Sequence, residues 1–139
     1  MNWKLLALGS AFFAGLTAVL GKVGVKDIPS NFATLIRTLV VIPLLVALVI
    51  ARDEWRHPGL LPKRSLLFLV LSGLATGLSW ICYYRALQEG PASIVAPLDK
   101  LSLLLAVALS VVFLGERLSA MQWTGALLMG AGALLLAFK

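Results

Sequence analysis

The chain has 139 residues, of which 60% are hydrophobic and only 13% are charged. A soluble domain carries charge on roughly a quarter of its residues, so the charges here are too few to cover a globule in water. Hydrocarbon must replace water as the main solvent, which also explains the mean hydropathy of +0.98. The excess of 12 basic over 6 acidic residues fits loops that face anionic lipid, and we expect no nucleic-acid binding.

Five apolar stretches are long enough to cross a bilayer as helices, since a span needs about 20 residues. They cover residues 3–21, 32–51, 65–87, 92–114 and 120–138. The runs are continuous and lack the alternation of a barrel strand. The sequence therefore predicts an all-α integral membrane protein, a compact bundle of five transmembrane helices in a single domain, residues 1–139.

Short connections separate these spans and make consecutive helices antiparallel neighbours. Ser30 or Asn31 is expected to cap the second helix, and Ser119 the last one. Six Lys or Arg side chains lie at the N-terminal side of the bundle and four at the other, chiefly because residues 52–64 hold four of the six. This bias predicts a cytoplasmic N-terminus in an inner membrane. The margin is thin, so insertion in both orientations stays open.

Small residues recur at the spacing that lets helices pack closely. Gly73 and Gly77 form a GxxxG motif in the third span, and Ala126 with Gly130 repeats the pattern in the last one. They would serve either packing within one protomer or a subunit interface. Cys82, the single cysteine, excludes an internal disulfide and is expected to be a small packing residue.

Ionisable side chains inside the spans carry the strongest functional signal, because a charge in a bilayer usually faces a cavity or a partner. Arg37 lies about two turns inside the second span, and Asp99 with Lys100 about two turns inside the fourth. Tyr83 and Tyr84 lie near the outer end of the third. All of them fall in the same half of the membrane, which predicts a polar chamber open to that side.

Helical spacing adds polar and aromatic side chains to these charges. Ser102 follows Asp99 at i+3 on the fourth span, and a second stripe on the third consists of Thr76, Trp80 and Tyr84. If the two stripes face each other, they line a pathway with aromatic walls and one carboxylate. Such a pathway suits an organic cation or an amphipathic metabolite.

Each of these residues also has a plainer interpretation. Arg37 could extend its guanidinium to the interface, and Asp99 and Lys100 could pair with charges on other helices. Tyr83 and Tyr84 could belong to an interfacial aromatic belt.

Prolines inside two spans are expected to loosen their helices, because proline removes a backbone hydrogen bond. They are Pro43 and Pro97, and Pro97 lies two residues before Asp99. A helix break beside a buried charge is a pattern of transporters. His57, the only histidine, has no nearby metal or nucleophile partner, so we expect no enzyme activity and no cofactor.

Three groups of motifs resemble those of EamA-type domains, which belong to the drug/metabolite transporter superfamily. Residues 84–98, YRALQEGPASIVAPL, resemble the start of the fourth helix of those domains, and residues 29–37 resemble their second-helix motif. The C-terminal signature is matched by residues 114–118, 122–125 and 130–132. The resemblance covers essentially the whole chain.

This resemblance implies a transporter built from a five-helix repeat. Most relatives carry two inverted repeats around a central cavity, whereas this chain has one, so we expect a homodimer, antiparallel or parallel, or a small paired subunit. Glu116, in the Gly-Glu-Arg turn, is interpreted as ordering that turn through backbone N–H groups. Small multidrug transporters use a glutamate in helix one, and its absence here argues against polyaromatic-cation/proton antiport.

The sequence thus predicts a small transporter that exports an organic metabolite or cation by alternating access. Asp99 would bind a cation or proton, Lys100 and Arg37 would balance or recognise charge, and Trp80 and Tyr84 would line the path. The alternatives are a flippase for polyprenyl-phosphate sugars and a partner subunit that does not itself transport.

Overall fold

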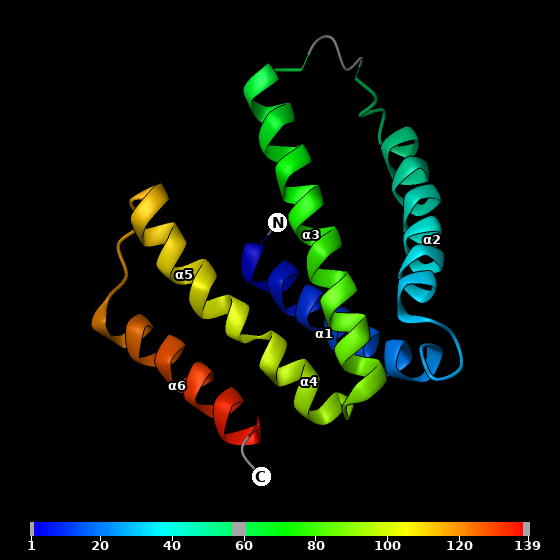
Figure 1. Cartoon of the computed structure of the whole chain (residues 1–139). Helices are drawn as coiled ribbons and strands as arrows, with labels where there is room; N and C mark the ends of the chain where they lie inside the picture. The colour runs from blue at the N-terminus through cyan, green and yellow to red at the C-terminus, as the bar shows by residue number, and fades with distance from the viewer. Residues whose placement is uncertain (1, 57–60, 138–139) are drawn as a thin grey trace. The chain divides into compact units, whose positions relative to one another are not determined.

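The computed structural model describes residues 2–56 and 61–137, and every regular element among them is a helix (Figure 1). The helices are α1 (Trp3–Gly24), α2 (Ser30–Ala51), α3 (Lys63–Glu89), α4 (Ala92–Asp99), α5 (Leu101–Leu114) and α6 (Ala120–Ala137). In this part of the chain five spans are long and apolar enough to cross a membrane, with α4 and α5 together forming the fourth. The predicted all-α fold with five spanning helices is confirmed.

Helix ends differ slightly from those predicted. α1 continues to Gly24, α2 begins at Ser30, and α3 covers Lys63–Glu89. Hydropathy marks only the apolar part of a span, whereas backbone hydrogen bonding continues through polar residues at its ends. The predicted end of the last span, residue 138, lies outside the described residues.

The chain divides into two compact units, one of residues 1–22 and 89–139 and the other of residues 23–88. In the first unit α6 packs along both α4 and α5. The second unit contains α2 and most of α3, which run antiparallel (Figure 1). Helix surfaces in both units carry many exposed large apolar side chains, as expected for surfaces that face lipid.

The fourth span is not the single helix predicted for residues 92–114, because it is broken at Lys100. Pro97 has no N–H to bond the carbonyl of Ser93, and its ring crowds that carbonyl. Lys100 takes ψ −6°, far from the α-helical value of about −42°. The N–H groups of Lys100 and Leu103 bond to carbonyls three residues back, at 3.0 and 2.9 Å. The expected loosening after Pro97 is therefore a local interruption at Lys100 within one span, whereas α2 continues through Pro43.

The turn between α5 and α6 is fixed at both ends by local hydrogen bonds. Gly115 ends α5 with φ +69°, a left-handed conformation that glycine adopts without steric penalty. At the start of α6 the N–H of Ser119 donates to Oε1 of Gln122 at 2.7 Å, and the N–H of Gln122 donates to Oγ of Ser119 at 3.3 Å. This reciprocal capping box confirms Ser119 as the predicted cap.

The second helix is not capped as predicted. Pro29 holds the N-cap position of α2 and no side chain caps it, while Ser30 is already helical and buried. The chain before α2 is held from α3 instead, because Nε2 of Gln88 donates to the carbonyls of Val25 and Ile28 at 3.1 and 3.0 Å.

The two small-residue motifs behave differently. Gly130 of α6 is buried against Leu104 of α5, so closely that a Cβ at this position would overlap the leucine side chain. This glycine therefore serves packing within one protomer, one of the two predicted roles. Around Gly73 and Gly77 of α3 a Cβ would meet nothing within 4 Å among the described atoms. Cys82 is exposed rather than packed within the chain.

Replacing Gly130 by Val should lower the free energy of unfolding by about 1–3 kcal/mol, because the added methyl groups overpack the contact with Leu104. Thermal unfolding in detergent, followed by circular dichroism, measures the change. Gly132→Val is the matched control, since Gly132 lies on the same helix and a Cβ there meets nothing within 4 Å. Gly132→Val should be neutral or slightly stabilising, because Val favours helix more than Gly. Equal losses in the two variants would contradict the packing role of Gly130.

Candidate functional site

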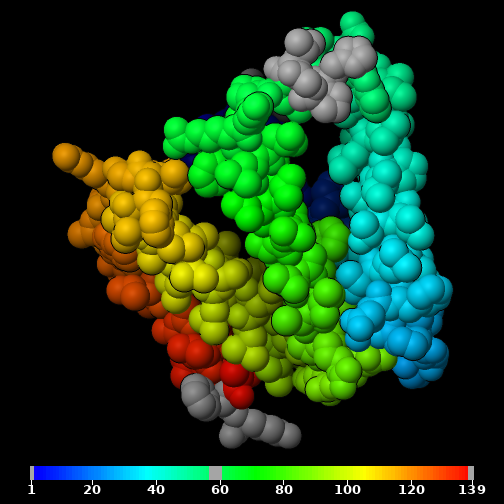
Figure 2. Space-filling model, turned by 45° about the horizontal axis from the view of Figure 1, so that its top comes forward, coloured from blue at the N-terminus to red at the C-terminus, as the bar shows by residue number. Residues whose placement is uncertain are grey.

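A groove with polar walls separates α2 from α3 within the second unit. It has a volume of about 590 Å³. Its lining residues are Asn31, Thr34, Leu35 and Thr38 of α2 and Leu69, Ser72, Gly73, Thr76, Gly77, Trp80 and Ile81 of α3. Figure 2 shows this space as an opening between α3, in green, and α2, in cyan. Two antiparallel helices thus leave room for a small organic molecule.

The three threonine hydroxyls in the groove already donate hydrogen bonds to their own helices. Thr34 donates to the carbonyl of Ser30, Thr38 to that of Thr34, and Thr76 to that of Ser72, each at 2.9 Å. A hydroxyl has one donor and two acceptor lone pairs, so these groups retain acceptor capacity. The walls are therefore suited to accept hydrogen bonds from N–H or O–H groups of a bound molecule.

The groove exists partly because Gly73 and Gly77 face it without side chains. Both glycines line it, and neither has a neighbour within 4 Å of an added Cβ. The GxxxG motif that sequence reasoning assigned to helix packing therefore widens a groove in this chain. A larger side chain at either position would extend into this space.

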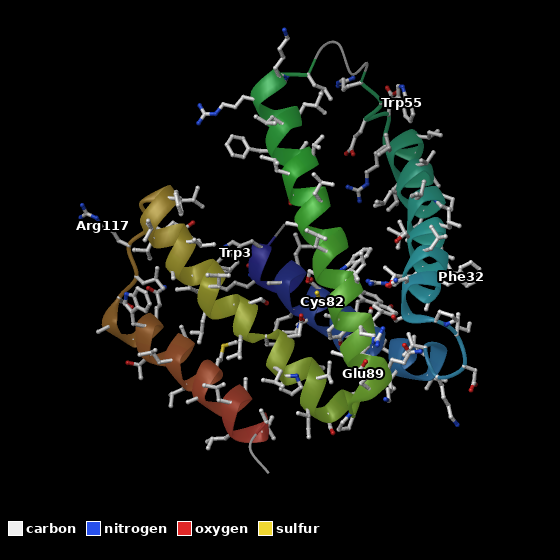
Figure 3. The ribbon with its side chains drawn as sticks, in the orientation of Figure 1. Trp3, Phe32, Trp55, Cys82, Glu89 and Arg117 are labelled. Atoms are coloured by element: carbon white, nitrogen blue, oxygen red, sulfur yellow. The ribbon has the colours of Figure 1, made fainter. Side chains whose placement is uncertain are left out.

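Arg37 of α2 contacts two aromatic rings of α3 beside this groove. Its Cζ lies 4.0 Å from the ring centroid of Trp80 and 5.5 Å from that of Tyr84. Trp80 also lines the groove, and Tyr84 is only 4% exposed. Tyr83 meets Tyr84 edge to face, with ring centroids 6.1 Å apart. Figure 3 shows side chains of both helices reaching into the space between the labelled Phe32 and Cys82.

These ring contacts stabilise the Arg37 charge only in part. An arginine at the centre of a spanning helix costs about 2.5–3.5 kcal/mol on insertion scales, and a cation–π contact returns about 0.5–2 kcal/mol. The Arg37 side chain forms no ion pair or hydrogen bond with any of the described residues. The acidic residues of its unit, Asp27, Asp53 and Glu54, all lie outside α2. The guanidinium N–H groups therefore depend on water or on a ligand.

Asp99 and Lys100 belong to the other unit, where they form an ion pair at the break between α4 and α5. Nζ of Lys100 lies 3.1 Å from Oδ2 of Asp99, with the side chains 50% and 31% exposed. One of the plainer interpretations paired each of them with a charge on another helix; in the described chain they pair with each other. Because both side chains are partly exposed, the pair adds little stability.

Lys100 also lines a second cavity, between α5 and α6, of about 420 Å³. Its other lining residues are Leu103, Leu104, Ala106, Val107, Ser110, Ala126 and Met129, so the cavity is mostly apolar. Ser102 is exposed and is not among them. Asp99 is not among them either, so neither residue of the stripe predicted on the fourth span lines this cavity.

Among the predicted site residues, the second unit thus brings Arg37, Trp80, Tyr84 and Tyr83 together, and the first unit brings Asp99 to Lys100. Glu116 is exposed in its turn, where its backbone N–H donates to the carbonyl of Ser110 at 3.3 Å, and its side chain forms no hydrogen bond or ion pair with the described residues. The turn is ordered by the Gly115 conformation and by the capping box of α6, described above.

Sequence reasoning did not assign the polar face of α2 to the pathway. Asn31, Thr34 and Thr38 follow one another at i, i+3 and i+7, which places them on one side of a helix. This spacing is present in the sequence, but uncharged hydroxyls inside an apolar run indicate a functional site less strongly than charges do. On α3, Thr76 and Trp80 were identified, and Ser72 was missed.

Comparison with known proteins gives consistent matches over the chain. The profile of the EamA-like transporter family matches residues 1–138. A protein from a Sinorhizobium species, named as an uncharacterized transporter in the cobO 3′ region, is 54% identical over 98% of this chain and 96% of its own length. An uncharacterized protein of Methanocaldococcus jannaschii is 28% identical over 97% of this chain and 96% of its own length. No solved structure matches the chain.

Proposed function

Since the chain belongs to the EamA-like transporter family, we propose that it carries an organic metabolite across the inner membrane through the groove between α2 and α3. The family and five apolar spans make it a small multi-pass membrane transporter. The transport direction in this proposal is outward. The N-terminus lies in the cytoplasm, an orientation that the distribution of basic residues favours.

The groove is the observation that carries this proposal. Its volume of about 590 Å³ lies within the range of about 300–1,000 Å³ found for sites of small organic ligands. Its polar groups, from Asn31 to Thr76, lie in two spans that consist mostly of apolar residues. Polar groups at this depth are expensive unless water or a substrate uses them.

The transporter works as a dimer in this proposal, by alternating access. The two relatives are covered over 96% of their lengths, so they too have the size of one five-helix repeat. Transporters of this type bind substrate between two inverted repeats. Because five spans place the two ends of a chain on opposite sides, two copies in opposite orientations reproduce such a pair.

Asp99 supplies the coupling site in this proposal, where it binds a proton or a cation. Its support is the helix break at Lys100 and the partial exposure of the Asp99–Lys100 pair. Transporters place ion sites at interrupted helices because the unwound backbone offers further polar groups.

Replacing Gly73 by Leu should stop transport while leaving the fold intact, because the leucine enters the groove and meets no described atom at its Cβ. Vesicles containing the purified protein are incubated with a uniformly ¹³C-labelled small-molecule extract of bacterial cells. Mass spectrometry then identifies the labelled compounds that the unaltered protein takes up. Uptake by Gly73→Leu should fall to the level of protein-free vesicles.

Gly125→Leu is the matched control for this variant. Gly125 lies on α6, a Cβ there also meets nothing within 4 Å, and it lines neither described cavity. This variant should retain uptake, and both should unfold at or above the temperature of the unaltered protein, since Leu favours helix more than Gly. Normal uptake by Gly73→Leu would exclude the groove as the pathway.

Asp99→Asn should abolish uptake of the same compounds without loss of expression, because the amide keeps the shape of the side chain but cannot carry the charge or exchange a proton. Glu116→Gln makes the same chemical change at an exposed turn and should leave uptake unchanged. Normal flux through Asp99→Asn would remove this carboxylate from the mechanism.

A C-terminal reporter tests the antiparallel pair. Green fluorescent protein fluoresces only in the cytoplasm and alkaline phosphatase is active only outside, so a chain inserted both ways should give both signals in separate fusions. Signal from one reporter alone would contradict the antiparallel pair and leave a parallel dimer or a paired subunit.

A further inference from the structure

We propose that Arg37 binds an oxyanion, a carboxylate or a phosphate, on the molecule that enters the groove between α2 and α3. This inference rests on the proposed function, because it names the chemical class of the substrate for that groove. Its structural basis is a cation inside a span that has aromatic contacts but no anionic partner in the described chain.

The contacts of Arg37 leave its hydrogen-bonding capacity unused. A guanidinium has five N–H donors arranged in its plane, and the rings of Trp80 and Tyr84 contact it without supplying oxygen or nitrogen acceptors. No buried polar side-chain atom in the described residues lacks a partner. The unpaired guanidinium nitrogens are therefore accessible from outside the protein. A carboxylate or phosphate pairs with two such N–H groups at once.

The ring contacts also orient the guanidinium. Arginine loses much rotamer freedom when it binds a ligand, and contact with two rings removes part of that freedom in advance. Trp80 lies at the junction, since it both contacts Arg37 and lines the groove. The guanidinium thus lies beside the wall of the groove in a restrained position, which lowers the entropy cost of binding a ligand there.

The same geometry disfavours the organic cation considered from the sequence. Trp80 and Tyr84 were predicted to offer their ring faces to such a substrate, but Arg37 already lies over both rings. A second cation at these faces would meet a like charge in a medium of low dielectric constant. Asp99, the carboxylate that was expected to attract such a cation, pairs with Lys100.

The remaining wall of the groove specifies the rest of the ligand. The threonine hydroxyls at 34, 38 and 76 donate to their own helices and keep lone pairs for the groove. They accept hydrogen bonds from O–H or N–H groups on the body of the molecule. An organic acid or phosphate ester that carries a hydroxyl or amino group matches both features.

A set of four probes, each with one phenyl ring and a different polar group, tests the charge preference. Full-length protein in detergent, labelled with ¹⁵N-arginine, is titrated with benzoate, phenyl phosphate, benzamide and benzylammonium, and the Nε–H signal of Arg37 is followed by nuclear magnetic resonance. The signal is identified by its absence in Arg37→Lys. Benzoate and phenyl phosphate should move it saturably, while benzamide and benzylammonium should not. Failure of both anions to move it, or an equal response to benzylammonium, overturns the proposal.

Two variants separate recognition by the guanidinium from general charge, with binding of radiolabelled benzoate as the readout. Arg37→Lys keeps the charge but loses the planar pair of donors, so its affinity for benzoate should be about tenfold lower. The affinity of Arg37→Gln should be lower still. Arg117→Gln removes one positive charge from an exposed turn and should bind as the unaltered protein does. Equal binding by Arg37→Gln and Arg117→Gln contradicts the proposal.

Nanodiscs distinguish the source of the oxyanion. The Arg37 signal is compared in nanodiscs of phosphatidylcholine alone and in nanodiscs to which undecaprenyl phosphate has been added. If only undecaprenyl phosphate shifts the signal, and benzoate does not reverse that shift, the site binds a lipid carrier. A shift by benzoate in both discs assigns it to a water-soluble acid. Because these measurements need no flux, binding at Arg37 with normal uptake by Gly73→Leu refutes the transport path but keeps the oxyanion site. Blocked uptake by Gly73→Leu without anion binding at Arg37 refutes the oxyanion site but keeps the transport path.

Discussion

A positive charge held inside a span of apolar side chains constrains the whole second unit. The Arg37 guanidinium cannot be left to hydrocarbon, and the contacts with Trp80 and Tyr84 compensate only part of the penalty. The rest requires polar atoms that the described residues do not supply, so water or a ligand must reach it. Trp80, which contacts the guanidinium, also lines the groove between α2 and α3, so the charge and the groove lie next to each other.

Glycine has opposite consequences in the two units, although the same spacing rule identifies both motifs. At Gly130 the missing side chain is replaced by Leu104 of the neighbouring helix, and the two helices pack closely. At Gly73 and Gly77 nothing replaces it, and the missing side chains become part of a cavity. Small residues therefore permit two helices to pack closely, but whether they do so depends on the side chains of the neighbouring helix.

A single five-helix repeat has a consequence for any transport mechanism. Alternating access needs two bodies that move against each other, and a substrate site at their boundary. The chain belongs to a family of transporters and shares its full length with relatives of similar size. In the proposed mechanism a second chain supplies the second body, and an odd number of spans makes an inverted pair geometrically accessible.

Local patterns in the sequence determined the fold class, the five spans, the break near Pro97 and the cap at Ser119. Each depends on hydropathy or on hydrogen bonds between residues a few positions apart, so no partner helix needs to be known. The depth of Arg37 in its span followed in the same way, and so did the Thr76–Trp80–Tyr84 face.

Only the tertiary structure decided which faces meet. It placed Arg37 against Trp80 and Tyr84, made α2 the second wall of the groove, and paired Asp99 with Lys100. Periodicity gives the direction of a side chain around its own helix axis. It does not distinguish the many rotations in which one apolar helix could pack against another. Packing and the few polar contacts select among them, and these join residues far apart in the chain.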